Sequence, residues 1–245
     1  MQTRFGLTVP DETNAANEHA GRVREMFSTI ATRYDFLNHF LSGNVDRRWR
    51  RLVARRVAGK LAPDSVILDV ACGTGDLSLE LFETTKVRVV GTDFCGPMLE
   101  IAATKVPGNI ELIESDALRL PFREGSFDLA TIAFGLRNLS SVAGGLAEMH
   151  RVVKPGGWVA VLEFSQPSNA MLRHLFGFYF NRVLPLMGGL ISGSRSAYTY
   201  LPKSVQRFPD QKELAFLMGK AGFSEVGYEN LTGGIAALHL GRKGK

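Results

Sequence analysis

Short apolar runs alternate with helix-like segments along most of the chain. Five runs rich in aliphatic residues have the length of buried strands: Val66–Val70, Val87–Thr92, Ile110–Glu114, Phe127–Phe134 and Trp158–Phe164. Helix-like segments lie between them at Leu77–Phe82, Pro97–Lys105 and Val142–Val153, and a tight turn is expected at Lys154–Gly157. Strands and helices that alternate in this order predict an α/β fold with a largely parallel, doubly wound sheet.

The pattern also predicts elements on both sides of this core. Before it, Val23–Lys60 has the pattern of helical segments broken near Ser42 and Gly43. After it come an insert, a helix and two closing strands, at Ser165–Pro209, Asp210–Ala221, Ser224–Glu229 and Ile235–Leu240. We therefore expect a seven-stranded, mostly parallel sheet in a single domain over residues 22–245. A mobile N-terminal tail (1–21), an N-terminal helical cap (22–62) and a helical insert (165–209) would complete the chain.

The stretch Val66–Asp76, VILDVACGTGD, joins a strand to a helix through a glycine-rich turn. Gly73 and Gly75 would let the backbone adopt positive φ and approach a ligand, and the helix N-terminus beyond them presents unpaired N–H groups. A dinucleotide fingerprint needs a third glycine where this chain has Ser78, and it rarely has an acid where this chain has Asp69. The stretch therefore favours a nucleotide-like ligand over a dinucleotide.

Three acidic residues stand at the ends of predicted strands. Asp69 lies just before the glycine turn, Asp93 ends the second strand, and Asp116 follows the third. Ligands of open α/β sheets bind outside the carboxyl ends of the strands, so these carboxylates and the segment Ala133–Asn138 are expected around one crevice. Asp93 could accept hydrogen bonds from both hydroxyls of a ribose, or it could cap the helix that begins near Gly96.

These acids and the Gly-x-Gly turn resemble the first two motifs of the S-adenosylmethionine-dependent methyltransferases with a class I, Rossmann-like fold. In the first motif an acid precedes the Gly-x-Gly turn, and in the second an acid ends the next strand. The resemblance implies S-adenosylmethionine as cofactor. The cofactor-binding residues that it implies are Asp69, Gly73, Thr74, Gly75, Asp93, Asp116 and Ala117. Of these, Asp93 would bind the ribose, and Asp116 with Ala117 would bind the adenine. The alternative for Asp116 is a turn or helix-cap residue.

Composition limits the number of domains and the cellular compartment that the sequence predicts. The chain has 245 residues, of which 45% are hydrophobic and 22% are charged, which fits one α/β domain with an embellishment. Its two cysteines, Cys72 and Cys95, form neither a disulfide framework nor a metal-ligand pattern. No metal is therefore expected, and a reducing compartment is indicated. The sequence shows no secretion signal and no uninterrupted apolar run of about 18 residues, so we expect a cytoplasmic protein.

The net charge of +5 and a pI near 9.4 allow anionic partners. An apolar helical stripe contains Trp49, Val53 and Val57. The surrounding basic residues are Arg47, Arg48, Arg50, Arg51, Arg55 and Arg56. This basic face is either solvated or rests on anionic lipid at the inner face of the cell membrane, where each cation would contribute about 1 kcal/mol. No aromatic stacking platform is interleaved with these arginines, so nucleic acid is not an expected partner.

Four longer stretches resemble one family of methyltransferases. Tyr34–Trp49 (YDFLNHFLSGNVDRRW) and Arg151–Pro167 (RVVKPGGWVAVLEFSQP) are similar to the two signatures of the menaquinone and ubiquinone biosynthesis C-methyltransferases. Phe134–Asn138 (FGLRN) and Tyr198–Pro209 (YTYLPKSVQRFP) are similar to further stretches of that family. One departure is Asp46, which stands where the first signature commonly has histidine.

This resemblance implies a reaction. The sulfonium methyl group would be transferred to a ring carbon of a prenylated quinol, converting demethylmenaquinol to menaquinol. The alternative acceptor is the 2-polyprenyl-6-methoxy-1,4-benzoquinol precursor of ubiquinone, because both quinols present a hydroxyl beside the methylated carbon. A soluble methyltransferase with a non-lipid acceptor is a further alternative. The sequence leaves the acceptor, the tail length, the general base and the oligomeric state open.

Arg137 and Asn138, after the fourth strand, are expected to hold the quinol oxygens. Arg137 stays protonated, so it can donate hydrogen bonds to a developing phenolate but cannot serve as a base. Tyr34 could orient the ring or relay its proton, and His39 and Asp35 are weaker base candidates. The alternatives are structural: Tyr34 could be half-buried and His39 could lie on a helix surface.

The insert segment Met171–Ile191 is rich in aromatic and aliphatic side chains and is expected to cover the prenyl tail. Burial of each methylene contributes about 0.8 kcal/mol, so even partial coverage would strengthen binding. The lid candidates are Phe178, Tyr179, Tyr198 and Tyr200. The alternatives for this segment are an ordinary helix-pair core and an interface within a homo-oligomer.

Overall fold

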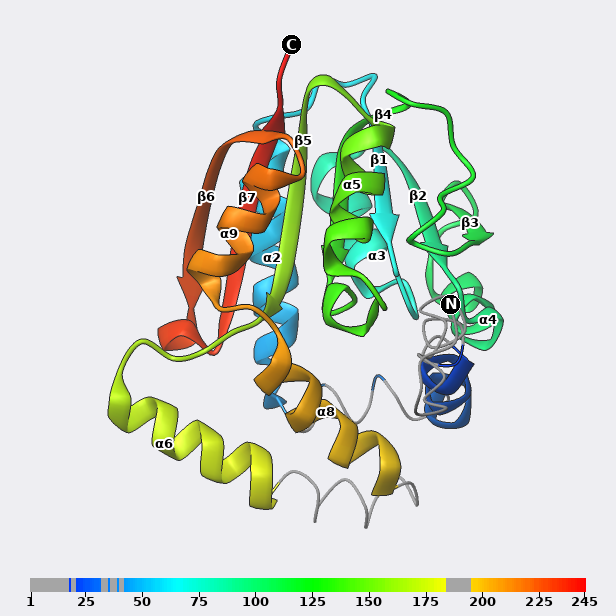
Figure 1. Cartoon of the computed structure of the whole chain (residues 1–245). Helices are drawn as coiled ribbons and strands as arrows, with labels where there is room; N and C mark the ends of the chain where they lie inside the picture. The colour runs from blue at the N-terminus through cyan, green and yellow to red at the C-terminus, as the bar shows by residue number, and fades with distance from the viewer. Residues whose placement is uncertain (1–17, 19–20, 32–34, 36–38, 40–41, 184–194) are drawn as a thin grey trace, which may run out of the picture.

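The computed structural model describes residues 18, 21–31, 35, 39, 42–183 and 195–245, which are built around one seven-stranded sheet (Figure 1). The strand order is β3-β2-β1-β4-β5-β7-β6. The strands are β1 Val66–Val70, β2 Arg88–Asp93, β3 Glu111–Glu114, β4 Phe127–Ala133, β5 Val153–Phe164, β6 Phe223–Leu231 and β7 Ala236–Lys243. The first five pair in parallel, and β7 pairs antiparallel with β5 and β6. The predicted seven-stranded, mostly parallel sheet is confirmed.

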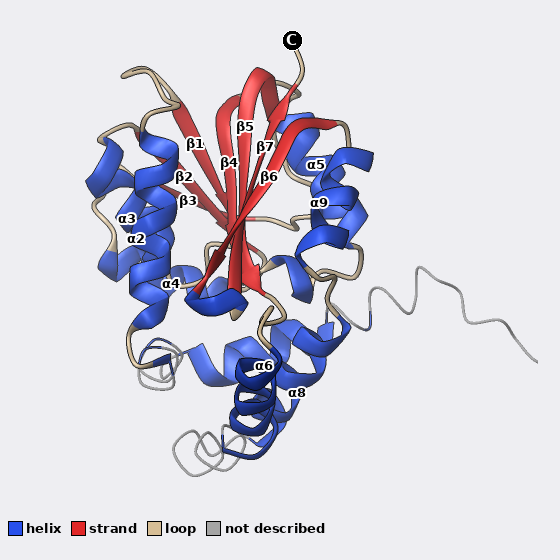
Figure 2. Cartoon of the chain, turned by 90° about the vertical axis from the view of Figure 1, so that its left-hand side faces the viewer, coloured by secondary structure: helices blue, strands red, loops and turns tan. Residues whose placement is uncertain are grey.

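Helices cover both faces of the sheet (Figure 2). The helices α2 Val45–Ala58, α3 Asp76–Thr85 and α4 Gly96–Lys105 lie on one face, and α5 Val142–Val152 and α9 Gln211–Lys220 lie on the other. Neighbouring strand residues enter opposite cores, since Ile67 packs with residues of α2 and α3 while Leu68 packs with residues of α5 and α9. Burial on both faces explains why these strands have continuous apolar sequences instead of alternating ones.

The start of β5 differs from the prediction. The residues Lys154–Gly157, expected as a turn before the strand, lie inside β5, which begins at Val153. Phe127 of β4 pairs with Val153, but Leu129 pairs with Trp158, so β5 carries extra residues at this point. A Pro-Gly-Gly sequence is typical of turns, but pairing of Val153 with β4 keeps the chain in the sheet. The expected turn is therefore an irregularity within the strand.

A further layer of helices lies at the carboxyl ends of the parallel strands (Figures 1 and 2). It contains helical residues 21–31 and the insert elements α6 Ala170–Phe178, η2 Tyr179–Val183 and α8 Arg195–Arg207. Ile30, Phe180 and Val205 form its small buried core, and Ala31 packs with Cys95 and Met98. The N-terminal helical residues thus connect the insert with the α4 side of the sheet. Two short turns, η1 Leu136–Asn138 and η3 Thr232–Gly234, follow β4 and β6.

Helix α2 follows the predicted stripe with one exception. Trp49, Val53 and Val57 are buried against the sheet, as expected. Arg50 was expected on the basic surface, but it is also buried, with Nη1 2.5 Å from Asp46 Oδ2. An aspartate one helical turn earlier therefore draws this guanidinium inward. The outward basic face consists of the other arginines only. No helix among the described residues has the length and apolar character needed to cross a bilayer.

Candidate functional site

A cavity of about 520 Å³ opens at the carboxyl ends of β1, β2, β3 and β4. Its floor is formed by the loops that follow these strands. Its described lining residues are Gly21, Arg24, Phe27, Ala71, Gly73, Asp93, Phe94, Met98, Glu114, Ser115, Asp116, Ala117, Leu118, Ala133, Phe134, Gly135, Asn138, Leu139 and Ser140. Among the predicted site residues, the cavity brings together Gly73, Asp93, Asp116, Ala117 and Asn138. Its volume falls within the range of small-molecule sites, about 300–1,000 Å³.

The glycine turn brings β1 close to α4. Gly75 has a φ of +82°, and a Cβ there would lie 2.9 Å from Val106 Cγ1 and 3.2 Å from Ala102 Cβ. Both the backbone conformation and the close packing therefore require glycine. Thr74 is buried, and its hydroxyl donates a hydrogen bond to Asp35 Oδ1 at 2.5 Å. Neither Gly75 nor Thr74 belongs to the described lining, so these two residues shape the turn from behind.

Asp69 lies beneath the turn and is almost completely buried. Its carboxylate accepts hydrogen bonds from the hydroxyls of Ser78 at 2.6 Å and Thr131 at 2.8 Å. Burial raises the pKa of Asp69 to about 6, although both hydroxyls oppose the shift. The carboxyl group links β1 with α3 and β4, and it is not part of the described cavity lining. This geometry favours a structural role for Asp69, which holds the glycine turn in place through α3 and β4.

The buried Asp69 makes the stability of the protein depend on pH. Because its pKa is raised from 3.8 to about 6, the folded chain retains a proton here that the unfolded chain releases. The unfolding free energy therefore falls as the pH rises through this window, by about 3 kcal/mol from this group. The Asp69→Asn variant has no proton to release at this position. Its unfolding free energy is therefore expected not to show this decrease with rising pH. Denaturant unfolding of both proteins at about pH 4 and about pH 7 measures the difference, and parallel changes in the two would contradict the assignment.

Asp93 lies at the end of β2 and faces the cavity. Its Oδ2 accepts a hydrogen bond from Gly73 N–H at 2.8 Å, and its Oδ1 accepts one from Cys95 N–H at 2.9 Å. Burial raises the pKa of Asp93, whereas these backbone N–H groups lower it. The bond to Cys95 closes a turn just before α4, whose N-cap residue Cys95 has no side-chain cap hydrogen bond, so Asp93 is not the expected helix cap. Its carboxylate lies in the cavity wall. Each oxygen retains acceptor capacity for a ligand hydroxyl.

Asp116 and Ala117 form the wall of the cavity after β3. Asp116 Oδ1 accepts a hydrogen bond from Leu118 N–H at 2.9 Å. This is the bond expected if Asp116 is a turn residue, the alternative to a role in adenine binding. Both residues also line the cavity. The turn bond fixes the carboxyl group next to the Ala117 N–H, so a local structural role and a ligand contact are compatible here.

The N-terminal helical residues close the cavity from outside. Gly21, Arg24 and Phe27 line it, and the Arg24 guanidinium donates a hydrogen bond to Glu114 after β3. Sequence reasoning identified a helical cap in this region but did not place it over the cavity. The sequence separation of 90 residues between Arg24 and Glu114 explains why no local pattern signals this contact.

The segment Phe134–Asn138 begins with a strained residue. Phe134 has a φ of +58°, which is uncommon for a non-glycine residue. Its ring lies 4.8 Å from that of Phe164 and 6.0 Å from that of Trp49, and it lines the cavity. The surrounding rings over-determine this conformation, as is typical of strained residues at functional sites. Next to it, a Cβ at Gly135 would lie only 2.7 Å from Ala71 Cβ, so the loops after β1 and β4 touch.

Arg137 is buried in a polar group that adjoins the cavity. Its Nη1 donates to Glu163 Oε1 at 2.9 Å and to the Phe134 carbonyl, and its backbone N–H donates to Glu163 Oε2 at 3.3 Å. Its Nε has no hydrogen-bond partner among the described residues. Asn138 Nδ2 donates to the same carbonyl at 3.2 Å and lines the cavity, whereas Arg137 lies behind it. This leaves the guanidinium with donors beyond its pairing with Glu163.

Sequence reasoning missed Glu163. This carboxylate is 1% exposed; burial raises its pKa, and Arg137 is the strongest influence that lowers it. The only local signal was an acid inside the otherwise apolar strand WVAVLEF. Tyr200 of α8 lies near this pair: burial raises the pKa of its hydroxyl, while the charge of Arg137 opposes the shift. The structure thus places a lid candidate beside the two buried charges.

The remaining predicted residues fall in different places. Tyr34 lies outside the described residues, and so does the side chain of Tyr198, although its backbone belongs to α8. Tyr179 is half-buried beside the small core that Ile30, Phe180 and Val205 form in the helical layer. Phe178 is exposed on α6 and does not cover the cavity in this conformation.

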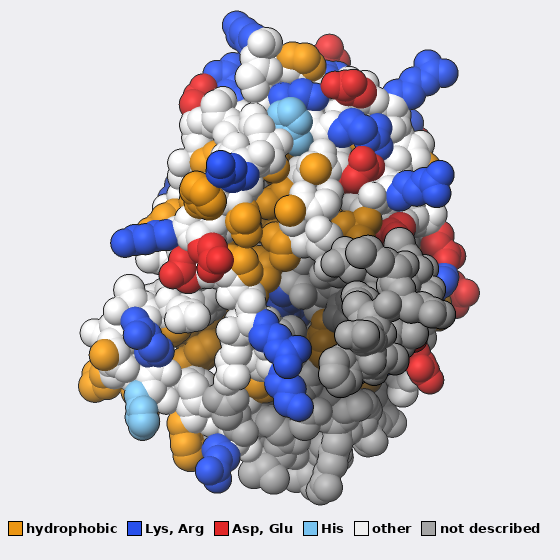
Figure 3. Space-filling model, in the orientation of Figure 1, with side chains coloured by type: hydrophobic (Ala, Val, Ile, Leu, Met, Phe, Trp, Pro, Cys, Tyr) orange, Lys and Arg blue, Asp and Glu red, His pale blue; other side chains and the backbone are white. Residues whose placement is uncertain are grey.

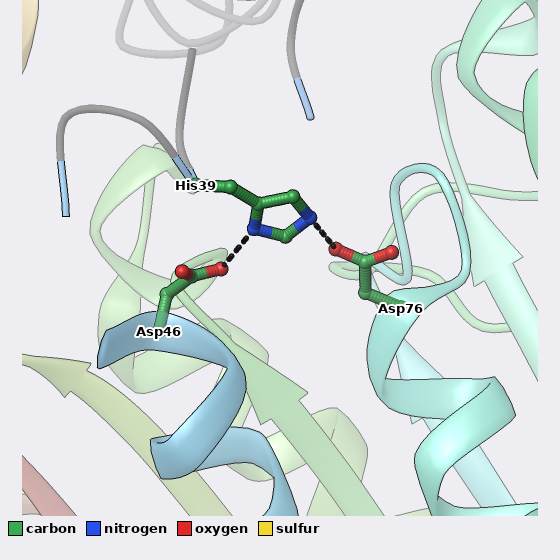
Figure 4. Close-up of side chains that lie close together, drawn as sticks. All are labelled: His39, Asp46 and Asp76. Atoms are coloured by element: carbon green, nitrogen blue, oxygen red, sulfur yellow. Dashed lines mark hydrogen bonds and ion pairs between the residues drawn. The ribbon is translucent and has the colours of Figure 1, made fainter. Parts of the chain in front are cut away.

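The base candidates Asp35 and His39 belong to a charged cluster outside the described cavity lining. Figure 4 shows His39 of this cluster between Asp46 and Asp76. His39 Nδ1 lies 2.8 Å from Asp46 Oδ2, and His39 Nε2 lies 3.6 Å from Asp76 Oδ2. Lys105 pairs with Asp76 and, at 2.7 Å, with Asp35. Three residues that could each offer a metal ligand, one histidine and two aspartates, lie together here. However, Arg50 and Lys105 already balance the carboxylates, so the geometry favours a link between the starts of α2 and α3 and the end of α4.

Arg50 and its neighbours also set the protonation of Asp46. Burial alone would raise the pKa of Asp46, but Arg50, Ser42 and His39 together outweigh burial and lower it. Asp46, which stands where the first signature commonly has histidine, therefore carries a negative charge. The neighbouring residues of the cluster balance that charge.

Comparison with known proteins identifies the family. The model of the ubiE/COQ5 methyltransferase family matches residues 13–243. The demethylmenaquinone methyltransferase of Thermus thermophilus is 50% identical over 220 residues, which cover 88% of this chain and 99% of the relative. The ubiquinone/menaquinone biosynthesis C-methyltransferase UbiE of Geotalea daltonii is 46% identical over 233 residues, which cover 92% of this chain and 98% of the relative.

A solved structure supports the fold. The SAM-dependent methyltransferase of Thermotoga maritima superposes with a TM-score of 0.62 at 21% identity, covering 89% of this chain and 99% of that one. At this identity the likeness shows the class I methyltransferase fold and not the substrate. Together with the family match over almost the whole length, it leads to one conclusion: the chain belongs to the ubiE/COQ5 methyltransferase family.

Proposed function

We propose that this protein transfers a methyl group from S-adenosylmethionine to a ring carbon of demethylmenaquinol, producing menaquinol. The observation that carries the proposal is the position of the buried Arg137–Glu163 pair and Asn138 beside a cavity lined by Asp93, Asp116 and Ala117. A donor group for an aromatic hydroxyl thus adjoins a wall suited to a nucleoside. The Thermus thermophilus relative is named for the same acceptor.

The residues present fit S-adenosylmethionine, which supplies an electrophilic methyl group when bound. Asp93 would accept hydrogen bonds from the ribose hydroxyls, because its two carboxylate oxygens are fixed by Gly73 and Cys95 and retain further lone pairs. Asp116 and the Ala117 N–H would hold the adenine. Gly73 would bring the backbone against the rest of the molecule. The buried carboxylate in the cavity wall is the observation that supports this fit.

Arg137 would activate the acceptor. A ring carbon becomes nucleophilic when the neighbouring hydroxyl loses its proton, because the phenolate oxygen then pushes electron density into the ring. The new C–CH₃ bond forms as the S–CH₃ bond breaks, S-adenosylhomocysteine leaves, and the ring carbon then releases its proton. Arg137 can donate hydrogen bonds to that oxygen, and Glu163 holds its guanidinium in place. Asn138 lies on the same turn and lines the cavity, so it would orient the other oxygen of the quinol. Alignment of ring carbon and methyl group can supply about 7–11 kcal/mol, so positioning should dominate.

An alternative acceptor is the benzoquinol precursor of ubiquinone. The name of the Geotalea daltonii relative includes both quinones, which favours keeping this second candidate. Both acceptors present the hydroxyl that Arg137 would contact.

The proposed reaction takes place at the surface of a membrane, because the prenyl tail of the acceptor partitions into lipid. The outward arginines of α2 are a weak candidate for this contact. Arg51 lies 3.5 Å from Glu80 and Arg56 lies 2.9 Å from Glu229, so acids already balance part of that face. Assembly into a homo-oligomer stays a prediction.

The test is conversion by the purified protein. With S-adenosylmethionine and reduced demethylmenaquinol in detergent, we expect menaquinol and S-adenosylhomocysteine in equal amounts, measured by mass spectrometry. The oxidised quinone should give neither, because it lacks the activating hydroxyl. Turnover of water-soluble phenols without turnover of the quinol would instead support a soluble small-molecule methyltransferase.

A further inference from the structure

The insert, residues 165–209, carries positive charge without any acidic residue. The chain has 29 Lys and Arg residues against 24 Asp and Glu. Residues 165–209 contain no Asp or Glu but have five basic residues: Arg173, Arg182, Arg195, Lys203 and Arg207. The rest of the chain therefore has 24 basic and 24 acidic residues, and the whole net charge of +5 belongs to the insert.

The same insert presents an apolar stripe to solvent. Met171, Leu175 and Phe178 of α6 are 71%, 57% and 62% exposed. Their spacing of four and three residues places them on one face of the helix. None of the nine residues of α6, all described, is buried. Figure 3 shows hydrophobic, basic and histidine side chains together where α6 lies, at the outer edge of the cap layer.

An unbroken file of aromatic rings leads from α6 to the cavity. The ring of Phe176, on the inner side of α6, lies 4.4 Å from that of Phe180. Phe180 lies 5.6 Å from Phe164, and Phe164 lies 4.8 Å from Phe134 in the cavity wall. Arg137 lies over the face of Phe164, 5.4 Å from its centre. The inner side of α6, whose outer side carries the exposed stripe, is therefore linked ring by ring with the place where the acceptor ring would bind.

We propose that the exposed face of α6, formed by Met171, Leu175 and Phe178, docks into the headgroup region of an anionic lipid membrane. The proposal rests on the proposed function, since it assigns the surface through which that site receives a lipid-tailed acceptor. A nine-residue helix is too short to span a bilayer, but an amphipathic helix with nearby cations binds in the interface plane. The cations of the insert whose side chains are described, Arg173, Arg182, Lys203 and Arg207, are exposed and so available to anionic headgroups. The aromatic file connects the lipid with the cavity.

Charge favours lipid over a second copy of the chain as the occupant of this face. In a two-fold dimer the same patch would meet itself, which would bring two inserts with five positive charges each together. An anionic bilayer offers the opposite sign over a wide area.

Vesicle binding tests the proposal without either substrate. We expect the full chain to co-sediment with phosphatidylcholine vesicles that contain phosphatidylglycerol and to be released by salt. The double variant Met171→Ser, Leu175→Ser should bind these vesicles about tenfold or more weakly, since two apolar anchors are lost. The matched control is Phe216→Ser on α9, whose side chain is 63% exposed on another helix and which should bind like the wild-type chain.

Two further measurements separate the outcomes. The double variant should methylate a short-tailed, water-soluble quinol at the wild-type rate and a long-tailed quinol in vesicles more slowly. Unchanged vesicle binding by the double variant, or no binding by the wild-type chain, would overturn the proposal. So would a wild-type dimer that the double variant dissociates in sedimentation velocity, which would assign α6 to a chain–chain interface. Vesicle binding without quinol methylation would instead contradict the proposed function alone.

Discussion

Replacing Arg137 with alanine lowers kcat for methyl transfer by about a hundredfold or more, the loss typical for removal of one preorganised donor to a developing oxyanion. The buried guanidinium is paired with Glu163 and retains donors beyond that pairing. The same substitution leaves Glu163 buried without its partner, which costs about 3–5 kcal/mol of stability. Steady-state kinetics on the folded fraction, with the circular dichroism melt measured in parallel, distinguish the two effects.

Two variants serve as controls for Arg137. Arg137→Lys keeps the charge but loses the planar fork, so it should recover stability better than rate. Glu163→Gln keeps the shape of the partner and should lower kcat less than Arg137→Ala, because Glu163 acts by positioning the guanidinium. The Kd for S-adenosylmethionine should stay unchanged in all three, since Arg137 is not among the described lining residues. Wild-type kcat in a folded Arg137→Ala protein would remove Arg137 from the mechanism.

Replacing Asp93 with asparagine raises the Kd for S-adenosylmethionine by about a hundredfold or more. The carboxylate would lose two hydrogen bonds to ribose, each worth about 1.5–3 kcal/mol when one partner is charged. An amide at this position also turns a donor toward either Gly73 N–H or Cys95 N–H, both of which now donate to the carboxylate. Isothermal titration calorimetry measures the Kd directly.

The matched control for Asp93 is Asp116→Asn. Asp116 is exposed and holds the Leu118 N–H through one oxygen, so its amide variant keeps an acceptor for that turn. We expect a Kd increase of only about tenfold, the value of one lost hydrogen bond. Equal effects of the two substitutions would contradict the assignment of ribose to Asp93.

The central parallel strands were predictable because they are buried on both faces. Continuous apolar runs such as Val66–Val70, each ending in a turn signal, mark parallel strands without ambiguity of face. The irregular start of β5 was not predictable, because Lys154–Gly157 has the sequence of a turn and only pairing of Val153 with Phe127 keeps it in the sheet. Local preference was overridden by a long-range contact.

The candidate site was predictable where a residue acts through its position on the strand edge. Gly73, Asp93, Asp116 and Ala117 follow strand ends, and the topology alone brings them to one cavity. The direction of a side chain was not predictable in the same way. Asp69 occupies the expected position but turns toward Ser78 and Thr131.

Contacts between distant segments account for the rest. Glu163 meets Arg137 across 26 residues, and Arg24 meets Glu114 across 90, distances over which a single sequence has no periodic signal. Arg50 followed the helical pattern of the α2 surface, yet Asp46 and Asp76 hold it inside. Charged residues are thus the ones for which the sequence alone was least informative, because their burial depends on partners.

The central claim is methyl transfer to the ring carbon of a prenylated naphthoquinol, and one measurement tests it most directly. The purified protein is given S-adenosylmethionine labelled in its methyl group, together with matched prenylated naphthoquinol and benzoquinol, both kept reduced in detergent. We predict label in the ring of the naphthoquinol, and label in both would extend the activity to the ubiquinone precursor. Label in neither quinol, with S-adenosylmethionine still bound, would contradict the quinol assignment and leave only a methyltransferase with another acceptor.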